Sequence, residues 1–548
     1  MHGQNPANRP PYPPPHGRPP VPSGPLPRSG GARLGDLDDR LIDTDVWADQ
    51  MVEAAGIPIV DVPFVTVGSG IGSFVTVDYL RIFGVPTDQM AVLGPQDVPW
   101  RSYEYLTRVS QIPRGERLRS DSQSMPDNIW GFPSYALQEA WKDRRLGPLW
   151  NVFTEPIIAN YYTPKAGQVF DAMEVEAKRI RYYDMLHNGQ VRMIRRRHGG
   201  GYFTILTPKA GTTRTKRVAF RSRWVHVAVG YPGLKFLPDL QEFRERYQAA
   251  AGRVVNAYEP HEQIYRSLAS RPGTVMIRGS GIVASRVLQR LIDDRDALGL
   301  QTQIVHLFRT YHDKAHGPHI MMRRKASHGW SYQGFNYPKS VWGGQLKDRV
   351  AGLEGYDRLQ WYKDISGTNT PIRKNWQRQL ERGRREGFYR VAVGKAVSLR
   401  PSPDGQGVDA TIEVDRLAPV EQPVGPDGTV GVHADFVIDC TGLEADVREH
   451  RLLADLLEHT GAGLNPLGRM DVERTFELRG TRSGEGRIYC SGTATMGGYF
   501  PGVDTFLGLQ IAADEITHDL VGQGFCRRLG PARSVKQWWR RMKVVGVD

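Results

Sequence analysis

Two glycine-rich stretches in this sequence have the residue types that hold a pyrophosphate. The first follows an apolar run, Val62–Val67, and precedes an apolar-rich segment, Phe74–Phe83. Glycine lets a turn close tightly and lets backbone N–H groups approach a phosphate, and the helix that follows directs its N-terminus toward the negative charge. The stretch therefore predicts a buried strand, a turn and a helix that bind a dinucleotide. The candidate binding residues are Gly68, Ser69, Gly70, Ile71, Gly72 and Ser73.

A second copy of this pattern lies in the middle of the chain. A β-branched run from Thr274 leads into the turn, and small residues follow where a helix must pack against its strand. Either stretch alone could be an ordinary strand-to-helix turn, but two together indicate two nucleotide sites in one chain. The candidates in the second stretch are Gly279, Ser280, Gly281, Ala284 and Ser285.

Length and composition narrow the class of protein. The 548 residues suffice for two or three domains with substantial cores. No apolar run approaches the length of a membrane span and no apolar leader is visible, so we expect no transmembrane helix and no secretory signal. The cysteines, Cys440, Cys490 and Cys526, are far apart and favour a reducing, cytoplasmic location. The net charge of +13 fits nucleic acid, an anionic membrane or acidic substrates, or only an arginine-rich proteome.

The strand expected after each turn ends differently in the two units. Most dinucleotide folds place an acidic residue at the end of the second strand to hold a ribose hydroxyl. After the strand Met90–Leu93 this chain has Gly94 instead, and we retain the nearby Gln96 as a candidate cofactor contact. In the second unit the strand Gln301–Thr310 carries Arg309.

The guanidinium of Arg309 suits a 2′-phosphate, because its planar fork binds phosphate bidentately. No acidic residue stands at that strand end to favour NADH, so the pattern favours NADPH, although a solvated arginine is the alternative. The nearby histidines His312, His316 and His319 have the spacing of metal ligands, but no cysteine or carboxylate cluster accompanies them. We therefore expect no metal site.

Several other segments have a recognisable composition. Residues 1–33 form a proline- and glycine-rich tail that cannot build a core, and Leu34–Ala55 has the pattern of an amphipathic helix. Trp100–Trp141 reads as a long loop with few helix or strand signals. Tyr162–Trp224 alternates short β-like runs with turn signals HNG and GGG, which predicts a β-meander ending in the strand Trp224–Val229.

The last quarter of the chain carries two further predictions. Tyr389–Leu399 and Asp409–Val414 are expected to return as strands of the first nucleotide unit. Val535–Lys543, VKQWWRRMK, is basic and aromatic. A solvated helix is the simpler interpretation of that segment and the one we expect, and contact with a membrane surface or nucleic acid is the less favoured alternative.

Five motifs together resemble the flavin monooxygenases, and in particular the N-hydroxylating branch. AVGYPGLKFLPD, between the two turns, is similar to the family's ATGY…P segment, and His261 and Tyr265 match its HSxxY spacing. GSGIVAS resembles its NADPH turn, GxGxSA. DFVIDCTG resembles a later strand ending in ATG, and Arg487–Ile516 resembles the last FAD strand, loop and helix. The order of the five is the specific part, and the Baeyer–Villiger fingerprint FxGxxxHxxxW is absent.

The resemblance implies an α/β protein with two Rossmann-like dinucleotide-binding domains, the NADPH domain inserted into the FAD domain, plus a β-meander. The expected limits are 34–250 and 386–522 for the FAD domain, 251–385 for the NADPH domain with an aromatic-rich insertion between the domains, and 523–548 for a basic C-terminal segment. The last helix is expected to start at Gly502 and Asp504 and to point at the flavin. It adds Gly492, Thr505 and Gly508 to the candidate FAD contacts.

The resemblance also implies a reaction. NADPH would reduce FAD, oxygen would form a C4a-hydroperoxyflavin, and a small-molecule nucleophile such as an amine nitrogen would be oxygenated. The loop from Trp100 and the aromatic-rich insertion would shape the substrate pocket. No catalytic acid or base and no oligomeric state can be named from the sequence. A flavin-dependent dehydrogenase or reductase and a non-catalytic flavoprotein sensor remain the alternatives.

Overall fold

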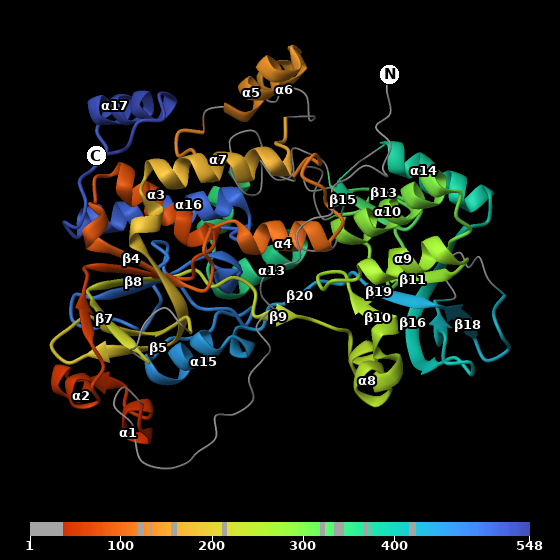
Figure 1. Ribbon diagram of the computed structural model, residues 1–548, viewed down its shortest axis with the longest axis horizontal. Coiled ribbons are helices and arrows are strands. Elements are labelled where there is room, and N and C mark those ends of the chain that lie inside the picture. The colour runs from red at the N-terminus through yellow and green to blue at the C-terminus, as the bar shows by residue number, and fades with distance from the viewer. Residues whose placement is uncertain are drawn as a thin grey trace.

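The computed structural model describes residues 37–118, 125–131, 134–154, 162–210, 216–317, 324–333, 345–365, 370–371, 374–415 and 423–548. The tail predicted for residues 1–33 lies outside these ranges. Figure 1 shows two α/β units side by side, each built around its own sheet. In the part of the chain described here, no helix is long and apolar enough to cross a membrane.

The first sheet has the order β2-β7-β6-β5-β4-β3-β8-β21, with β1 beside β5. At its centre β3 (Phe64–Val67) pairs in parallel with β4 (Met90–Gly94) and with β8 (Trp224–Val227), and β21 (Arg487–Cys490) continues beyond β8. Helices α3 (Ile71–Ile82), α7 (Ala166–Arg179) and α16 (Phe506–Gly522) cover one face, and α15 (Arg451–His459) covers the other. Covered on both faces, these strands consist of apolar runs without polar alternation.

The β-meander exists but begins later than predicted. It consists of β5 (Leu186–Arg197), β6 (Tyr202–Pro208) and β7 (Val218–Ser222), with β2 (Ile59–Asp61) beside β7. The GGG turn joins β5 to β6, but HNG lies inside β5, where that strand leaves β4 and begins to pair with β6. The segment before β5 is α7, because its buried apolar residues recur at helical spacing and not at alternate positions.

The second sheet has the order β10-β19-β11-β12-β16-β17-β18. Its strands are β10 (Val254–Asn256), β11 (Thr274–Arg278), β12 (Gln303–Phe308), β16 (Tyr389–Pro401), β17 (Val408–Val414), β18 (Thr429–Ala434) and β19 (Phe436–Asp439). Helices α9 (Glu262–Ser270), α10 (Ile282–Leu298) and α14 (Lys374–Arg385) pack on one face, and α8 (Pro238–Arg246) packs on the other.

The second sheet corrects one prediction about domain limits. We expected Tyr389–Leu399 and Asp409–Val414 to return to the first unit, but β16 pairs in parallel with β12, and β17 pairs with β16. The strand that matched DFVIDCTG, β19, also lies in this sheet, between β10 and β11. The chain therefore leaves the second unit after Asp439 and not near residue 385. Strand patterns report burial, but they do not report which neighbouring strand is paired.

The chain passes between the two units twice, and the two connecting segments pair with each other. β9 (Gly233–Leu234) on the outward crossing is antiparallel to β20 (Leu443–Glu444) on the return. The insertion contributes β13 (Lys325–Ser327), β14 (Trp330–Gln333), β15 (Thr370–Pro371), α12 (Gln345–Ala351) and α13 (Gly355–Ile365). From α13, the hydroxyl of Tyr362 donates to the carbonyls of Gly498 (3.0 Å) and Phe500 (2.9 Å). This contact joins α13 to the first unit, whereas Trp330 of β14 lies in the core of the second unit.

Three more segments differ from the sequence-based prediction. In place of one helix over Leu34–Ala55 there are α1 (Asp39–Ile42), β1 (Val46–Trp47) and α2 (Asp49–Ala54), because Trp47 turns inward to a buried position. The expected loop from Trp100 contains α4 (Arg101–Val109) and the start of α5 (Ser134–Asp143), which α6 (Gly147–Thr154) follows. The C-terminal helix α17 (Pro531–Met542) is attached to the first unit and is not simply solvated, since Arg541 pairs with buried Asp127.

Candidate nucleotide-binding sites

The first glycine turn leaves β3 and has room above it. Gly68 has φ of +100°, and a Cβ there would lie 2.2 Å from the carbonyl oxygen of Ala228 at the end of β8. Only glycine fits such a contact and such a backbone angle. Gly70 caps α3, and a Cβ added there meets no atom within 4 Å. The turn is thus packed tightly against the sheet below and open on the side that a phosphate would approach.

The second turn, after β11, has nearly the same geometry. Gly279 has φ of +109°, and its Cβ would lie 2.7 Å from the carbonyl oxygen of Cys440, just past the end of β19. The helix cap Gly281 has φ and ψ of −87° and −173°, against −89° and −169° for Gly70. Each helix therefore directs its first N–H groups in the same way relative to its sheet, as a pyrophosphate site requires.

Small residues bring each helix close to its sheet, as predicted. A Cβ on Gly72 would lie 3.0 Å from the Cβ of Ala228, and Ser73 is fully buried. In the second unit Ala284 and Ser285 are fully buried, and the Ser285 hydroxyl donates to the carbonyl of Ile282 at 2.6 Å. Larger side chains at these places would push the helix N-terminus away from the strand end.

A buried histidine lies beneath the first turn. His226 on β8 contacts the hydroxyl of Thr66 on β3 through Nδ1 (3.0 Å) and the hydroxyl of Ser491 after β21 through Nε2 (2.8 Å). Thr66 also donates to the hydroxyl of Ser73 at the start of α3 (2.7 Å). Burial lowers the pKa of His226 to about 3, so the imidazole is neutral. This network joins β3, α3, β8 and the segment after β21, and the ends of these four elements surround the first glycine turn.

A second buried histidine lies beneath the second turn, on the strand that follows the turn's helix and so on the other side of the turn from the place of His226. His306 on β12 lies 2.7 Å from the carbonyl of Gly279 through Nε2, and a carbonyl can only accept. Nε2 therefore carries the proton, and Nδ1 accepts from the hydroxyl of Tyr389 at 2.9 Å. Burial lowers the pKa of His306 to about 3. Sequence reasoning missed both histidines, although each stands inside an otherwise apolar strand, which was a usable signal.

The missing acidic residue at the end of β4 has a steric explanation. A Cβ on Gly94 would lie 2.4 Å from the backbone nitrogen of Ser69, so the first turn occupies the space beside this strand end. The Ser69 hydroxyl accepts a hydrogen bond from the backbone N–H of Gln96 at 2.8 Å. Ser69 and Gln96 thus hold the turn and the loop after β4 together, and the Gln96 side chain is half-buried beside them.

The start of α16 differs from the prediction. The helix begins at Phe506 with Thr505 as its cap, whose side chain accepts from the N–H of Gly508 at 3.1 Å. Gly502 precedes the helix, and a Cβ on Gly508 would lie 2.1 Å from the Gly502 carbonyl oxygen. The absence of a side chain at Gly508 therefore serves the packing of the 502–505 turn, which shapes the helix N-terminus. Gly492, at φ of +80°, begins the turn after β21.

The polar residues expected around the second turn are only partly brought together. Arg309 directly follows β12, is exposed, and has no ion pair within the described ranges. His261 lies before α9 and its Nε2 is 3.2 Å from the hydroxyl of Tyr265, so this pair is internal to the helix start. His312 and His316 stack at 4.1 Å between ring centroids, whereas His319 lies outside the described residues. Among the residues that the structure describes, no cluster of ligands could hold a metal ion.

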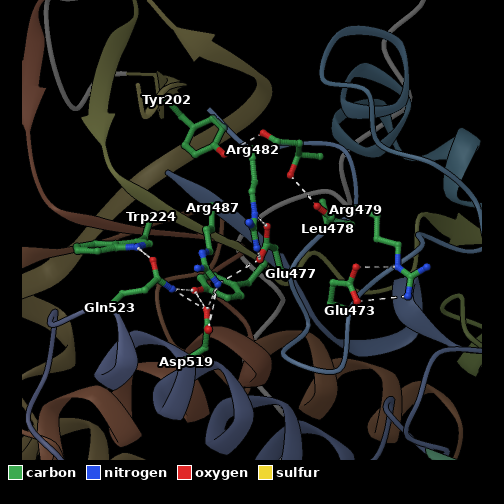
Figure 2. Close-up of polar contacts among 12 residues, drawn as sticks. Tyr202, Trp224, Glu473, Glu477, Leu478, Arg479, Arg482, Arg487, Asp519 and Gln523 are labelled. Carbon is green, nitrogen blue, oxygen red and sulfur yellow. Dashed lines mark hydrogen bonds and ion pairs between the residues drawn. The ribbon is translucent and has the colours of Figure 1, made fainter. Parts of the chain in front are cut away.

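A polar network fixes the opposite end of the first unit's last strand and helix, as Figure 2 shows. The Arg487 guanidinium on β21 donates to Asp519 on α16 at 2.9 and 3.0 Å and lies 3.3 Å from buried Glu477. Gln523 donates to Asp519 at 2.6 Å and accepts from the Trp224 indole at 2.7 Å. These contacts fix α16 against β21 and β8 at this end. The other ends of the three elements lie around the first turn.

No protein-family model matches the sequence, and no curated protein matches it. Among solved structures, ornithine hydroxylase from Pseudomonas aeruginosa in its reduced form is 16% identical, with 84% of this chain and 99% of that chain covered and a TM-score of 0.59.

Two further solved structures are similar to the same extent. An ornithine N-hydroxylase from Kutzneria sp. 744, with reduced FAD, NADP+ and L-ornithine, is 12% identical, with coverages of 85% and 100% and a TM-score of 0.59. A cadaverine monooxygenase from Erwinia amylovora bound to FAD is 11% identical, with coverages of 85% and 96% and a TM-score of 0.57. The chain has the fold of these N-hydroxylating flavin monooxygenases, which confirms the α/β fold with two Rossmann-like units and the resemblance read from the five motifs.

Proposed function

We propose that this protein is an NADPH-dependent FAD monooxygenase that hydroxylates the nitrogen of a small-molecule amine. The proposal depends chiefly on one observation, the two glycine turns of nearly equal geometry, each at the end of a central strand that pairs in parallel with both of its neighbours. The overall fold is that of ornithine hydroxylases and a cadaverine monooxygenase, which supports the proposal.

The first turn suits the FAD pyrophosphate. The open space over Gly70 and the N-terminus of α3 offer N–H donors where the phosphates would lie. We assign Gly68–Ser73 and Gln96 to this part of the cofactor. Gly492, Thr505 and Gly508 are assigned to the segment that would border the flavin ring, with the N-terminus of α16 stabilising negative charge there.

The second turn suits NADPH. We assign Gly279, Ser280, Gly281, Ala284 and Ser285 to the pyrophosphate, since they repeat the geometry of the first turn. Arg309 is assigned to the 2′-phosphate, because it is exposed at a strand end and no described carboxylate neutralises it.

The flavin would supply hydride acceptance and oxygen chemistry, and the chain would bind, orient and exclude water. The contacts of Tyr362 with the 498–500 segment place the insertion against the first unit, where it can restrict solvent access. Arg358 adds to that contact by lying 3.8 Å from the ring centroid of Tyr499. A small amine and oxygen are the proposed reactants. A cytoplasmic location is part of the proposal, and the three cysteines are buried and free, as a reducing compartment allows.

The test begins with the absorbance spectrum of the purified protein, which should contain bound flavin. Anaerobic NADPH should bleach the flavin band, and NADH should do so more slowly. Oxygen and a diamine such as cadaverine or ornithine should then yield a hydroxylamine product in step with NADPH consumption.

Two outcomes would support the alternatives. Oxygen uptake that yields only hydrogen peroxide with every amine tried would favour a dehydrogenase or reductase. Bound flavin that NADPH fails to reduce would favour a flavoprotein sensor. A colourless protein that acquires no flavin on reconstitution would remove the whole class.

A further inference from the structure

Four of the five most exposed large apolar side chains of the described molecule lie on one helical hairpin. Helices α5 and α6 project from the first unit in Figure 1, beyond α7. Four large side chains are mostly in water: Trp141 (89% exposed), Leu146 (79%), Trp150 (64%) and Phe153 (78%). Because exposed apolar side chains that gather on one element mark interaction sites, the hairpin is a candidate interaction surface.

The basic helix α17 lies beside this hairpin. Buried Asp127 connects them, because it accepts from the Tyr135 hydroxyl on α5 and from the Arg541 guanidinium on α17. The Trp130 indole also donates to the Ser534 hydroxyl at 3.0 Å. α17 and the residues after it expose a second apolar set, namely Val535, Trp539, Met542, Val544 and Val545.

Both segments combine these apolar side chains with an excess of positive charge. Residues 134–154 and 523–547 together contain ten lysines and arginines but only two acids, both in the hairpin. One acid, Glu139, is buried and paired with Arg117, and the other, Asp143, lies 3.6 Å from Lys165. The exposed cations include Lys142, Arg144, Arg145, Lys536 and Lys543, which have no ion pair among the described residues.

We propose that the α5–α6 hairpin and α17 form a docking surface for an anionic lipid membrane. Large aromatic and aliphatic side chains beside lysines and arginines are what binds at a headgroup layer, where apolar groups enter the acyl boundary and cations meet phosphates. Binding is peripheral, because no described helix is long and apolar enough to cross the membrane.

A second copy of the chain fits this surface less well. A two-fold interface would place the same basic surface against itself, so that like charges would be opposed across it. An anionic bilayer instead neutralises them. From the sequence, membrane contact was only the less favoured alternative for the basic C-terminal segment, and the exposed hairpin beside it was not foreseen.

The test uses the full chain with vesicles of phosphatidylcholine, with and without phosphatidylglycerol, in a co-sedimentation assay. The wild-type protein should bind the anionic vesicles about tenfold or more tightly than the neutral ones, and added salt should weaken the binding. The double variant Trp141→Gln/Phe153→Gln should lose about tenfold in partitioning. Neutralising Lys142, Arg144 and Arg145 to Gln should remove most of the preference for anionic vesicles.

The matched control is Leu298→Gln/Tyr356→Gln, which removes two exposed apolar side chains from other parts of the molecule and should leave binding unchanged. All variants change exposed side chains, and circular dichroism verifies that they fold. Equal partitioning of the hairpin and control variants, or no binding of the wild type, would overturn the proposal. So would sedimentation velocity that detects a dimer which only the hairpin variant dissociates.

Discussion

The two buried histidines predict a specific dependence of stability on pH. The imidazoles of His226 and His306 are fully buried, each is hydrogen-bonded in its neutral form, and burial lowers each pKa from 6.5 to about 3. In the unfolded chain both titrate near 6.5. Between these two pH values the unfolded state binds more protons than the folded state, so stability must fall as the pH falls.

The magnitude follows from proton linkage. On going from pH 7 to pH 5, protonation of one such imidazole in the unfolded chain lowers the free energy of unfolding by about 2 kcal/mol. Any folded pKa below about 4 gives the same result, because the folded imidazole then stays neutral over the whole interval. The two histidines together contribute about 4 kcal/mol of pH-dependent loss.

The variant His226→Gln keeps a donor and an acceptor but cannot titrate. The free energy of unfolding is measured by urea unfolding, followed by circular dichroism, at pH 7 and at pH 5. Its decrease from pH 7 to pH 5 should be smaller in this variant than in the wild type by about 2 kcal/mol. Comparing the pH difference, and not the absolute stability, cancels the effect of the substitution itself on packing. Buried carboxylates also contribute to the pH dependence of stability. Their contribution is the same in the variant and in the wild type, so it cancels when the two pH differences are compared.

The control is His198→Gln, which changes an exposed histidine. In this variant the free energy of unfolding should differ between pH 7 and pH 5 by the same amount as in the wild type. An unchanged pH difference in His226→Gln would refute the reasoning, because the imidazole under the first turn would then have to be able to take up a proton in the folded state.

Three further predictions concern the nucleotide sites. Gly70→Val should yield a folded but colourless protein, because a Cβ there meets no protein atom within 4 Å and the branched side chain enters the path of the pyrophosphate; a yellow variant with unchanged FAD affinity would contradict the assignment. Arg309→Ala should raise the KM for NADPH about tenfold, equivalent to about 1.4 kcal/mol, and affect NADH much less, and equal effects on both would remove it from the 2′-phosphate site. Gly508→Leu should perturb the flavin spectrum or abolish turnover, because any Cβ there collides with the Gly502 carbonyl and displaces the turn that caps α16; a silent variant would show that this turn does not shape the flavin site.

The sequence by itself determined the parts that depend on local backbone conformation. The two glycine turns, their preceding strands and the small residues in the following helices could all be predicted. A positive φ at Gly68 or Gly279 and an apolar strand are properties of a few consecutive residues. The order of the five motifs along the chain then sufficed for the fold class.

Tertiary structure decided what depends on partners far apart in sequence. Thr66, His226 and Ser491 meet only because β3, β8 and β21 are neighbours in the sheet. Strand β16 belongs to the second unit because it pairs with β12, which its own apolar pattern cannot report. The same holds for α17, whose Arg541 pairs with Asp127 across more than 400 residues of sequence. Periodicity reports which face of an element is buried, whereas the partner that buries it is set by the packing of the whole chain.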